Sequence, residues 1–253
     1  MGTEETRMSS TAILDPPGEG APLINSDPFA GNGAAVISIT AAPPPAAVAP
    51  PHRLYDGAKR VVDLTASAIG ILMCLPLLLL IAIAIKLSSR GPVFFRQRRP
   101  GRGGRQFRIL KFRTMYLDAH RRFKKLSPEQ QREFNEYGKI STDPRVTPVG
   151  RWLRRFSVDE LPQLINVLRG EMSLVGPRPY LNMQLKQMGA HRRTIFEVAP
   201  GLTGIWQVSG RNEISSEQRL EMDVEYVLSR SIRNDLAILA RTPLAMISGT
   251  GAY

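Results

Sequence analysis

The chain has 253 residues and a formal net charge of +12, from 34 lysines and arginines against 22 aspartates and glutamates. Its single cysteine, Cys74, excludes an intramolecular disulfide, and its three scattered histidines exclude a zinc site built from clustered Cys and His ligands. Such a basic chain predicts a polyanionic partner: nucleic acid, an anionic lipid surface or a phosphorylated substrate.

Residues 1–52 are predicted to form a disordered tail. The stretch AAPPPAAVAPP cannot hold a helix, because proline lacks the backbone donor and clashes with the preceding turn. The first 50 residues hold five acids and one arginine, a charge of −4, so the rest of the chain carries +16. The N-terminus lacks the pattern of a signal peptide, which is a basic segment followed by an apolar run. A secretory signal is therefore not expected.

An uncharged apolar segment of 22 residues follows, at 64–85. As a helix it would reach roughly 33 Å, enough to cross the hydrocarbon core of a bilayer. However, Pro76 interrupts the segment and would kink it. Basic residues also flank both ends, namely Lys59, Arg60, Lys86 and Arg90. A kinked helix that enters and leaves on one side of the membrane accounts for both observations, and a single crossing is the alternative.

The chain then becomes strongly basic, with ten lysines and arginines and no acid between residues 86 and 113. A strand is predicted at 93–96, a Gly-rich turn at 101–104 and a second strand at 106–113, which together indicate a β-hairpin. The charge suits an anionic lipid surface, and some of these bases could also hold substrate phosphates.

Further helices are predicted along the rest of the chain. Residues 117–137 indicate a polar, exposed helix, in which Ser127 is an N-cap and Pro128 takes the first helical position. Residues 215–230 and 233–247 indicate two more, and the second is apolar enough to lie on a membrane.

Two adjacent acids stand in the basic stretch FSVDELPQLINVLRG, at Asp159 and Glu160. Ser157 has capping-box spacing to Glu160, and the helix would start at Ser157 or restart at Pro162 and end at Gly170. The acids could simply stabilise that helix end. Alternatively, because neighbouring helical residues point about 100° apart, one carboxylate could attack a phosphate while the other holds a metal ion.

Two turns each present an arginine. In GPRP (176–179) the prolines fix the path of Arg178 and the glycine permits unusual backbone angles. A guanidinium held in this way suits bidentate phosphate binding, although an exposed arginine in a turn would have the same sequence. GRN (210–212) is a weaker example, which makes Arg211 another candidate for substrate binding.

From about residue 56 to its C-terminus the chain resembles the bacterial sugar transferases, the monotopic phosphoglycosyl transferases. The matching pieces are KRVVDL, GPVFFRQRRPGRGGRQFRILKFRTM, DPRVTPVGRWLRRFSVDELPQLINVLRGEMSLVGPRP, PGLTGIWQVSGRN and GTGAY. In its short form the chain most resembles the undecaprenyl-phosphate galactose-phosphotransferases of exopolysaccharide synthesis.

The resemblance implies transfer of a sugar-1-phosphate from a UDP-sugar to undecaprenyl phosphate, with release of UMP. Galactose is the expected sugar, followed by glucose and then an N-acetylated sugar. The family's adjacent acids imply that Asp159 forms a phosphosugar-aspartyl intermediate and that Glu160 binds Mg²⁺. The basic positions that the family uses near the phosphates correspond to Lys111, Arg154 and Arg178.

The fold implied is α+β: a predominantly helical monotopic membrane protein with a small β-hairpin. A transferase domain would occupy 53–253, with a re-entrant helix at 59–88 that is kinked at Pro76. Many family members carry serine before this proline, and here the residue is Leu75. The active site is expected on the cytoplasmic face of the bacterial inner membrane.

The expected partners are the UDP-sugar, undecaprenyl phosphate, an anionic membrane surface and other polysaccharide-assembly proteins, but not nucleic acid. The competing hypothesis is a membrane-tethered basic module that binds nucleic acid or lipid without catalysis. It accounts for the charge and the apolar segment. It leaves the acidic pair and the GPRP turn unexplained.

Overall fold

A computed structural model describes residues 53–247, except 138–139, 141, 187 and 211–213. The predicted tail, Arg211 and the terminal GTGAY lie outside the described residues. The described helices and strands are, in chain order, α1 (Arg53–Ser88), β1 (Phe94–Pro100), β2 (Gln106–Phe112), α2 (Ala119–Phe123), α3 (Pro128–Tyr137), α4 (Pro148–Arg155), α5 (Gln163–Leu168), β3 (Ser173–Val175), α6 (His191–Ile195), β4 (Gly201–Thr203), α7 (Ile205–Ser209), α8 (Ser216–Ser229) and α9 (Ile232–Ile247).

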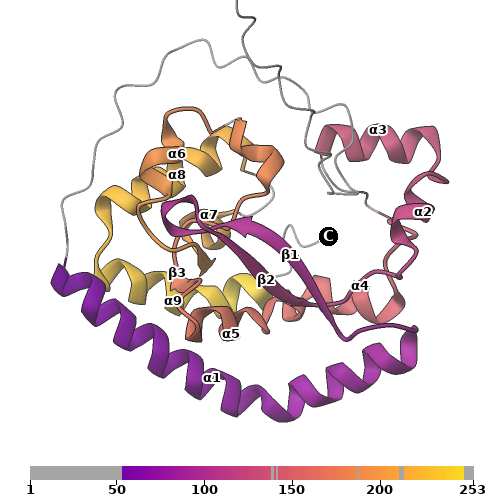
Figure 1. Ribbon diagram of the computed structural model, residues 1–253, viewed down its shortest axis with the longest axis horizontal. Coiled ribbons are helices and arrows are strands. Elements are labelled where there is room, and N and C mark those ends of the chain that lie inside the picture. The colour runs from indigo at the N-terminus through magenta and orange to yellow at the C-terminus, as the bar shows by residue number, and fades with distance from the viewer. Residues whose placement is uncertain (1–52, 138–139, 141, 187, 211–213, 248–253) are drawn as a thin grey trace, which may run out of the picture. The chain divides into compact units, whose positions relative to one another are not determined.

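The apolar segment forms most of α1, a helix of 36 residues that continues through Pro76. Figure 1 shows that α1 bends along its length, so that both of its ends turn toward the rest of the domain. A proline inside a helix removes one backbone hydrogen bond and is a common cause of such a bend. The bent shape is compatible with a re-entrant path, which itself stays a prediction.

One face of α1 packs against the domain, and much of the remaining surface is apolar and exposed. Ile81 and Ile85 are buried with Phe112 and Leu153 in a small core. The large exposed apolar side chains of α1 are Leu54, Val61, Leu64, Ile69, Leu72, Met73, Leu75, Leu77, Leu79, Leu80, Ile83 and Leu87. Only 11% of its most apolar 18-residue window is buried, so α1 is not an ordinary core helix. It is the one described helix long and apolar enough to cross a membrane, and it is compatible with membrane association.

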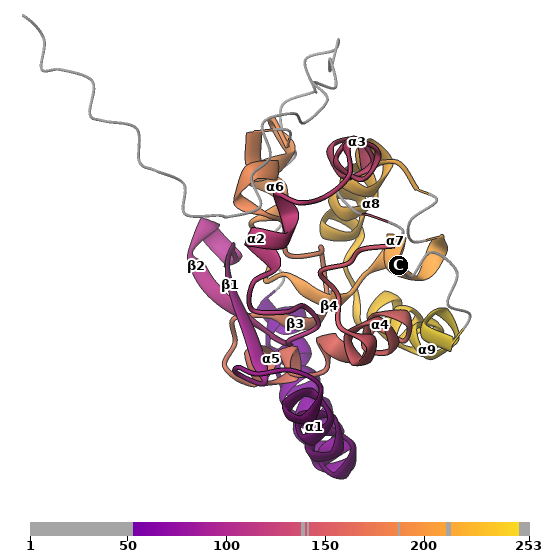
Figure 2. The same cartoon turned by 90° about the vertical axis from the view of Figure 1, so that its right-hand side faces the viewer.

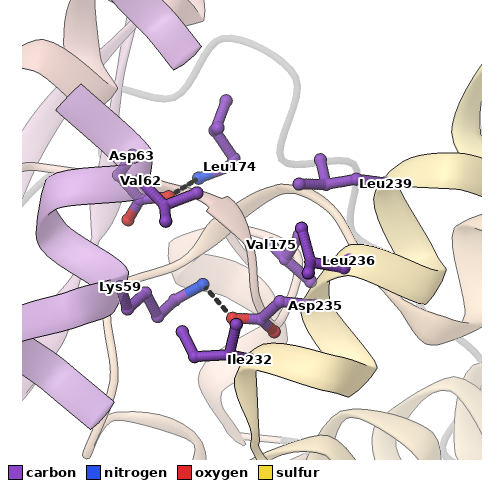
Figure 3. Close-up of a pocket in the computed structure, with 9 residues that line it drawn as sticks. All are labelled: Lys59, Val62, Asp63, Leu174, Val175, Ile232, Asp235, Leu236 and Leu239. Atoms are coloured by element: carbon purple, nitrogen blue, oxygen red, sulfur yellow. Dashed lines mark hydrogen bonds and ion pairs between the residues drawn. The ribbon is translucent and has the colours of Figure 1, made fainter. Parts of the chain in front are cut away.

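Polar contacts attach the N-terminal half of α1 to α9 and β3. The Lys59 ammonium lies 2.7 Å from Oδ2 of Asp235 on α9. The buried carboxylate of Asp63 accepts a 3.0 Å hydrogen bond from the backbone N–H of Leu174 on β3 (Figure 3). Because these side chains converge from three elements, they fix the entry of the apolar helix onto the domain.

Arg60 makes a third attachment, to the end of α5. Its guanidinium donates hydrogen bonds of 2.6 and 2.9 Å to the backbone carbonyls of Val167 and Leu168. The last carbonyls of a helix lack intrahelical partners and attract positive charge. Lys59 and Arg60, which the sequence offered as topology signals, therefore also hold the structure together.

The predicted hairpin is confirmed. Strands β1 and β2 pair antiparallel from Phe94↔Phe112 to Pro100↔Gln106. A second pair, β3 with β4, is parallel and joins Ser173↔Gly201 and Val175↔Thr203, which the sequence analysis did not anticipate. The main hydrophobic core lies between these sheets and helices α5, α8 and α9, and includes Ile109, Val167, Val175, Val227 and Ile238.

The later helices mostly follow the sequence prediction. The expected helix at 117–137 is two helices, α2 and α3. Ser127 caps α3, since its hydroxyl accepts a 3.2 Å hydrogen bond from the Gln130 backbone N–H. The predicted helices at 215–230 and 233–247 correspond to α8 and α9. In Figures 1 and 2 the labelled part of α8 lies on the side of the domain away from α1.

Candidate active site

The two adjacent acids lie in a tight turn between α4 and α5. After α4 ends, Ser157 adopts a left-handed backbone conformation (φ 54°, ψ 21°), and a 3₁₀ turn then spans Val158–Glu160. Ser157 is the only non-glycine residue with positive φ in the described part of the chain. Such backbone strain is often found at functional sites.

The predicted capping box is wrong. The Ser157 side chain makes no capping hydrogen bond, because the left-handed backbone turns it away from the usual N-cap geometry. Helix α5 instead restarts after Pro162, which stands at its N-cap position. Gly170 follows the helix at φ 76°, as predicted for a left-handed helix end.

Asp159 is buried, with 9% of its surface exposed. Burial raises the pKa of its carboxyl to about 6, with a further increase from the charge of Glu160, while Lys111, Arg154 and Arg178 lower it. No described side chain or backbone group forms a hydrogen bond to this carboxylate. Near neutral pH it is therefore a mostly ionised group with a free oxygen, as a nucleophile requires.

Glu160 is held by two cations. Its Oε1 lies 2.8 Å from Lys111 Nζ and 2.9 Å from a terminal nitrogen of Arg178. Burial alone would raise the pKa of this carboxyl, but the two positive charges and their hydrogen bonds outweigh it and hold the pKa well below its usual range. The pKa values of the adjacent acids are thus shifted in opposite directions: Asp159 becomes protonated in mild acid, whereas Glu160 stays an anion.

The GPRP turn is positioned by close contact between two backbone segments. The Gly176 N–H donates to Thr203 O at 3.0 Å, and the Gly201 N–H donates to Pro177 O at 2.7 Å. A Cβ on Gly201 would lie 2.1 Å from the Gly176 nitrogen, so no side chain fits there. Gly176 is needed for this close approach and does not have positive φ, which corrects the expectation of unusual backbone angles.

Arg154 comes from α4, on another side of the site. Its Nε donates a 2.9 Å hydrogen bond to the Thr114 hydroxyl, just beyond the end of β2. Burial lowers the pKa of this guanidinium, while the carboxylate of Asp159 raises it. The structure therefore brings together five predicted residues, Asp159, Glu160, Lys111, Arg154 and Arg178, whereas Arg211 is not described.

The ten bases between residues 86 and 113 divide into two groups. Three make contacts within the protein. Lys111 contacts Glu160, and Arg99 donates a hydrogen bond to the Pro179 carbonyl. The buried Arg113 donates to the carbonyls of Ser89 and Arg90 and so caps the end of α1. The other seven are exposed: Lys86, Arg90, Arg96, Arg98, Arg102, Arg105 and Arg108. The sequence analysis missed the structural contacts of Arg99 and Arg113, because charge alone does not distinguish a helix cap from a surface patch.

Four residues near the site were also missed. Trp206 on α7 lies beside Arg178, with 5.8 Å from the ring centroid to Arg178 Cζ. Arg219 lies 4.8 Å from the same ring. Tyr180 donates a 2.7 Å hydrogen bond to the buried carboxylate of Asp223. The sequence signals were the spacing of Arg219 and Asp223, one helical turn apart, and the place of Trp206 in the matching piece PGLTGIWQVSGRN.

The donors at the site suit magnesium when a substrate supplies the remaining ligands. In the part of the chain that the structure describes, no group of three or more His, Cys, Asp or Glu side chains forms a metal site. Magnesium is commonly held by one or two carboxylates together with substrate phosphates. Glu160, whose Oε1 already contacts two cations, retains Oε2 for such a role, so the residues fit the ion.

The family model for bacterial sugar transferases matches residues 54–249. The exopolysaccharide production protein ExoY of Rhizobium meliloti is 42% identical over 199 residues, which are 78% of this chain and 88% of the relative. The chain therefore belongs to the bacterial sugar transferase family. This confirms the resemblance found in the sequence and makes the chain a transferase of the phosphoglycosyl class.

Other relatives carry more specific names. The undecaprenyl-phosphate glucose phosphotransferase of Komagataeibacter xylinus is 45% identical over 210 residues, 77% of this chain and 37% of the relative. The undecaprenyl-phosphate galactose phosphotransferase of Salmonella typhimurium is 37% identical over 198 residues, 77% of this chain and 41% of the relative. Both are much longer proteins, and the chain spans less than half of each.

Proposed function

We propose that this transferase moves a sugar-1-phosphate, with galactose as the first candidate sugar, from a UDP-sugar to undecaprenyl phosphate. The observation that carries the proposal is the pair Asp159 and Glu160, surrounded by Lys111, Arg154 and Arg178. A carboxylate approaches a diphosphate only when positive charge neutralises the phosphate oxygens. These three bases supply that charge around the two acids.

In the first step an oxygen of Asp159 attacks the β-phosphorus of the donor. A new bond forms between carboxylate oxygen and phosphorus. The bond from that phosphorus to the bridging oxygen breaks, and its electron pair leaves with UMP. The products are UMP and a sugar phosphate bound to Asp159 as an acyl phosphate. The free carboxylate oxygen and its near-neutral pKa suit this role.

In the second step a phosphate oxygen of undecaprenyl phosphate attacks the same phosphorus. The acyl phosphate bond breaks, its electrons return to the Asp159 carboxylate, and undecaprenyl-diphosphate-sugar is released. One diphosphate linkage replaces another, so the cycle needs no further energy source. Splitting the transfer lets a water-soluble donor and a lipid acceptor react in turn at one site.

Glu160 would hold Mg²⁺ through the carboxylate oxygen that Lys111 and Arg178 leave available. When bound, the ion would neutralise phosphate charge in the transition state. Arg178 and Lys111 keep Glu160 ionised, so the ligand would be ready at any pH at which Asp159 is also charged.

The membrane geometry belongs to the same proposal. Residues 53–253 would form the transferase domain, with the exposed apolar surface of α1 in the bilayer and both helix ends on the cytoplasmic side. The exposed arginines after α1 would face anionic lipid headgroups. This arrangement keeps the site at the interface, where an acceptor phosphate lies.

A cysteine-labelling experiment tests this topology. An engineered cysteine in the 1–52 tail, with Cys74 replaced by serine, should react only after the inner membrane is permeabilised. Labelling from the periplasm would show that α1 crosses the bilayer.

Glucose is the second candidate sugar, because the Komagataeibacter relative is named for it. Offering purified protein a panel of UDP-sugars with Mg²⁺, and measuring UMP release, decides between the two. We expect the highest rate with UDP-galactose. A higher rate with UDP-glucose would reassign the sugar, and no UMP release from any donor, with or without acceptor, would contradict the proposal.

A further inference from the structure

Arg219 on α8 stands next to the site without belonging to the catalytic cluster. Its Cζ is 4.8 Å from the centroid of the Trp206 ring, and Arg178 Cζ is 5.8 Å from the same centroid. Arg178 in turn holds Glu160. The ring of Trp206 therefore supports two guanidinium groups, and only one of them is paired with an acid of the site.

Arg219 makes no ion pair or hydrogen bond through its side chain within the described residues, and its buried Nε lacks a partner. The acid best placed to pair with it is Asp223, one helical turn further along α8. However, the Asp223 carboxylate accepts a hydrogen bond from Tyr180 and forms no ion pair with Arg219. A half-buried cation with an unpaired N–H is costly unless a ligand supplies the anion.

The position of Arg219 on α8 directs it inward. Leu220, Asp223, Tyr226 and Val227 are the buried residues of this helix. Arg219 is four residues before Asp223, so the two share the face that packs on the domain. Burial and the positive charge of Arg178 lower the pKa of Arg219, as expected for a guanidinium close to another cation.

The location of α8, the helix that carries Arg219, also distinguishes the two substrates. The acceptor would approach from the membrane, on the side of α1. The labelled part of α8 lies on the opposite side of the domain in both views (Figures 1 and 2). A phosphate bound on the α8 side of the site would therefore belong to the soluble substrate.

We propose that Arg219, supported by Trp206, binds a phosphate of the donor nucleotide, on the side that leaves as UMP. This inference rests on the proposed function and adds a residue that recognises the leaving group. Trp206 would keep the guanidinium flat and in place, as cation–π contacts do in other proteins. The guanidinium of Arg219 is a charged, planar hydrogen-bond donor whose geometry suits a phosphate group.

Binding of UMP to the full-length protein in detergent, measured by titration calorimetry, tests the proposal without requiring turnover. Arg219→Gln should weaken UMP binding roughly 10- to 100-fold, the usual effect of losing a charge-assisted hydrogen bond. Arg219→Lys should lose less of the affinity for UMP, because lysine keeps the positive charge. Arg193→Gln removes one exposed charge on α6 and should bind UMP like the wild type.

Kinetics of the two half-reactions complete the test. Arg219→Gln should raise the KM for the UDP-sugar by a similar factor and leave the reaction of the preformed intermediate with undecaprenyl phosphate unchanged. Unchanged UMP affinity in an active, folded Arg219→Gln enzyme would overturn the inference, and so would a defect confined to the acceptor step. A wild-type protein that neither binds UMP nor reacts would instead contradict the proposed function.

Discussion

Two clusters of buried carboxylates and cations in the described residues, the attachment of α1 and the candidate active site, are built differently. At the attachment of α1, Asp235 accepts hydrogen bonds from Tyr55, Lys59 and Tyr226, at 2.9, 2.7 and 2.8 Å. The charged groups of this cluster are paired with each other within the protein. At the candidate active site Asp159 has no hydrogen bond from a described residue, although three cations lower its pKa.

This difference separates structural charge from functional charge. A closed network stabilises the fold because each partner loses its hydration in exchange for a direct contact. An open cluster with excess positive charge is electrostatically incomplete, and an anionic substrate completes it. The comparison predicts that the two clusters respond in opposite ways to the same kind of substitution.

The largest effect is expected from Asp159→Asn. The amide cannot attack phosphorus, so UMP release without acceptor should fall at least about a thousandfold. Stability should not fall, because the carboxylate has no hydrogen bond to lose. Single-turnover UMP release and thermal unfolding measure the two effects. Retained UMP release in this variant would remove Asp159 from the nucleophile role.

The matched substitution at the attachment cluster is Asp235→Asn. It leaves the half-buried Lys59 without its counter-charge, so the free energy of unfolding should fall by roughly 2–4 kcal/mol. The KM for donor should stay unchanged in the enzyme that remains folded. Chemical denaturation in detergent measures the loss, and unaltered stability would show that the closed network contributes little.

Glu160→Gln should weaken the binding of Mg²⁺. Removing this ligand charge should raise the Mg²⁺ concentration for half-maximal UMP release at least about tenfold, because even outer-shell changes at metal sites have such effects. Asp143→Asn, at an acid that instead pairs with Arg145 in the fold, serves as the matched control. An identical magnesium titration in the Glu160 variant would argue against its role as a ligand.

The pH dependence should give the smallest effect. Burial raises the pKa of Asp159 to about 6, so the nucleophile becomes protonated as pH falls through that value. The rate of the first half-reaction should be about tenfold lower at pH 5 than on its plateau above pH 7. Glu160, with its lowered pKa, stays charged over this range. A rate that stays constant down to pH 5 would disagree with the buried state of Asp159.

The sequence predicted the hairpin, the later helices and the end of α5, because turn glycines, caps and apolar periodicity act locally. It also selected five residues that the structure brings together. It could not predict the β3–β4 pairing, which depends on the close approach of Gly176 and Gly201 across the fold. Nor could it separate Arg113, a cap of α1, from the exposed arginines around it.

Ser157 shows a second limit of local patterns. Its spacing to Glu160 fits a capping box, yet its backbone lies in the left-handed region and α5 begins only after Pro162. Arg219 escaped prediction for a related reason. Its partners, Trp206 and Arg178, come from other segments of the chain, and nothing in the local sequence places them together.

The most direct test of the open cluster is to look for the covalent intermediate. Full-length protein is incubated with Mg²⁺ and UDP-galactose labelled with ³²P in its β-phosphate, without acceptor, and the labelled peptide is mapped. The account predicts a stoichiometric burst of UMP and label on the peptide that contains Asp159, which undecaprenyl phosphate then removes. UMP release that requires the acceptor, with no label on the protein, would contradict it.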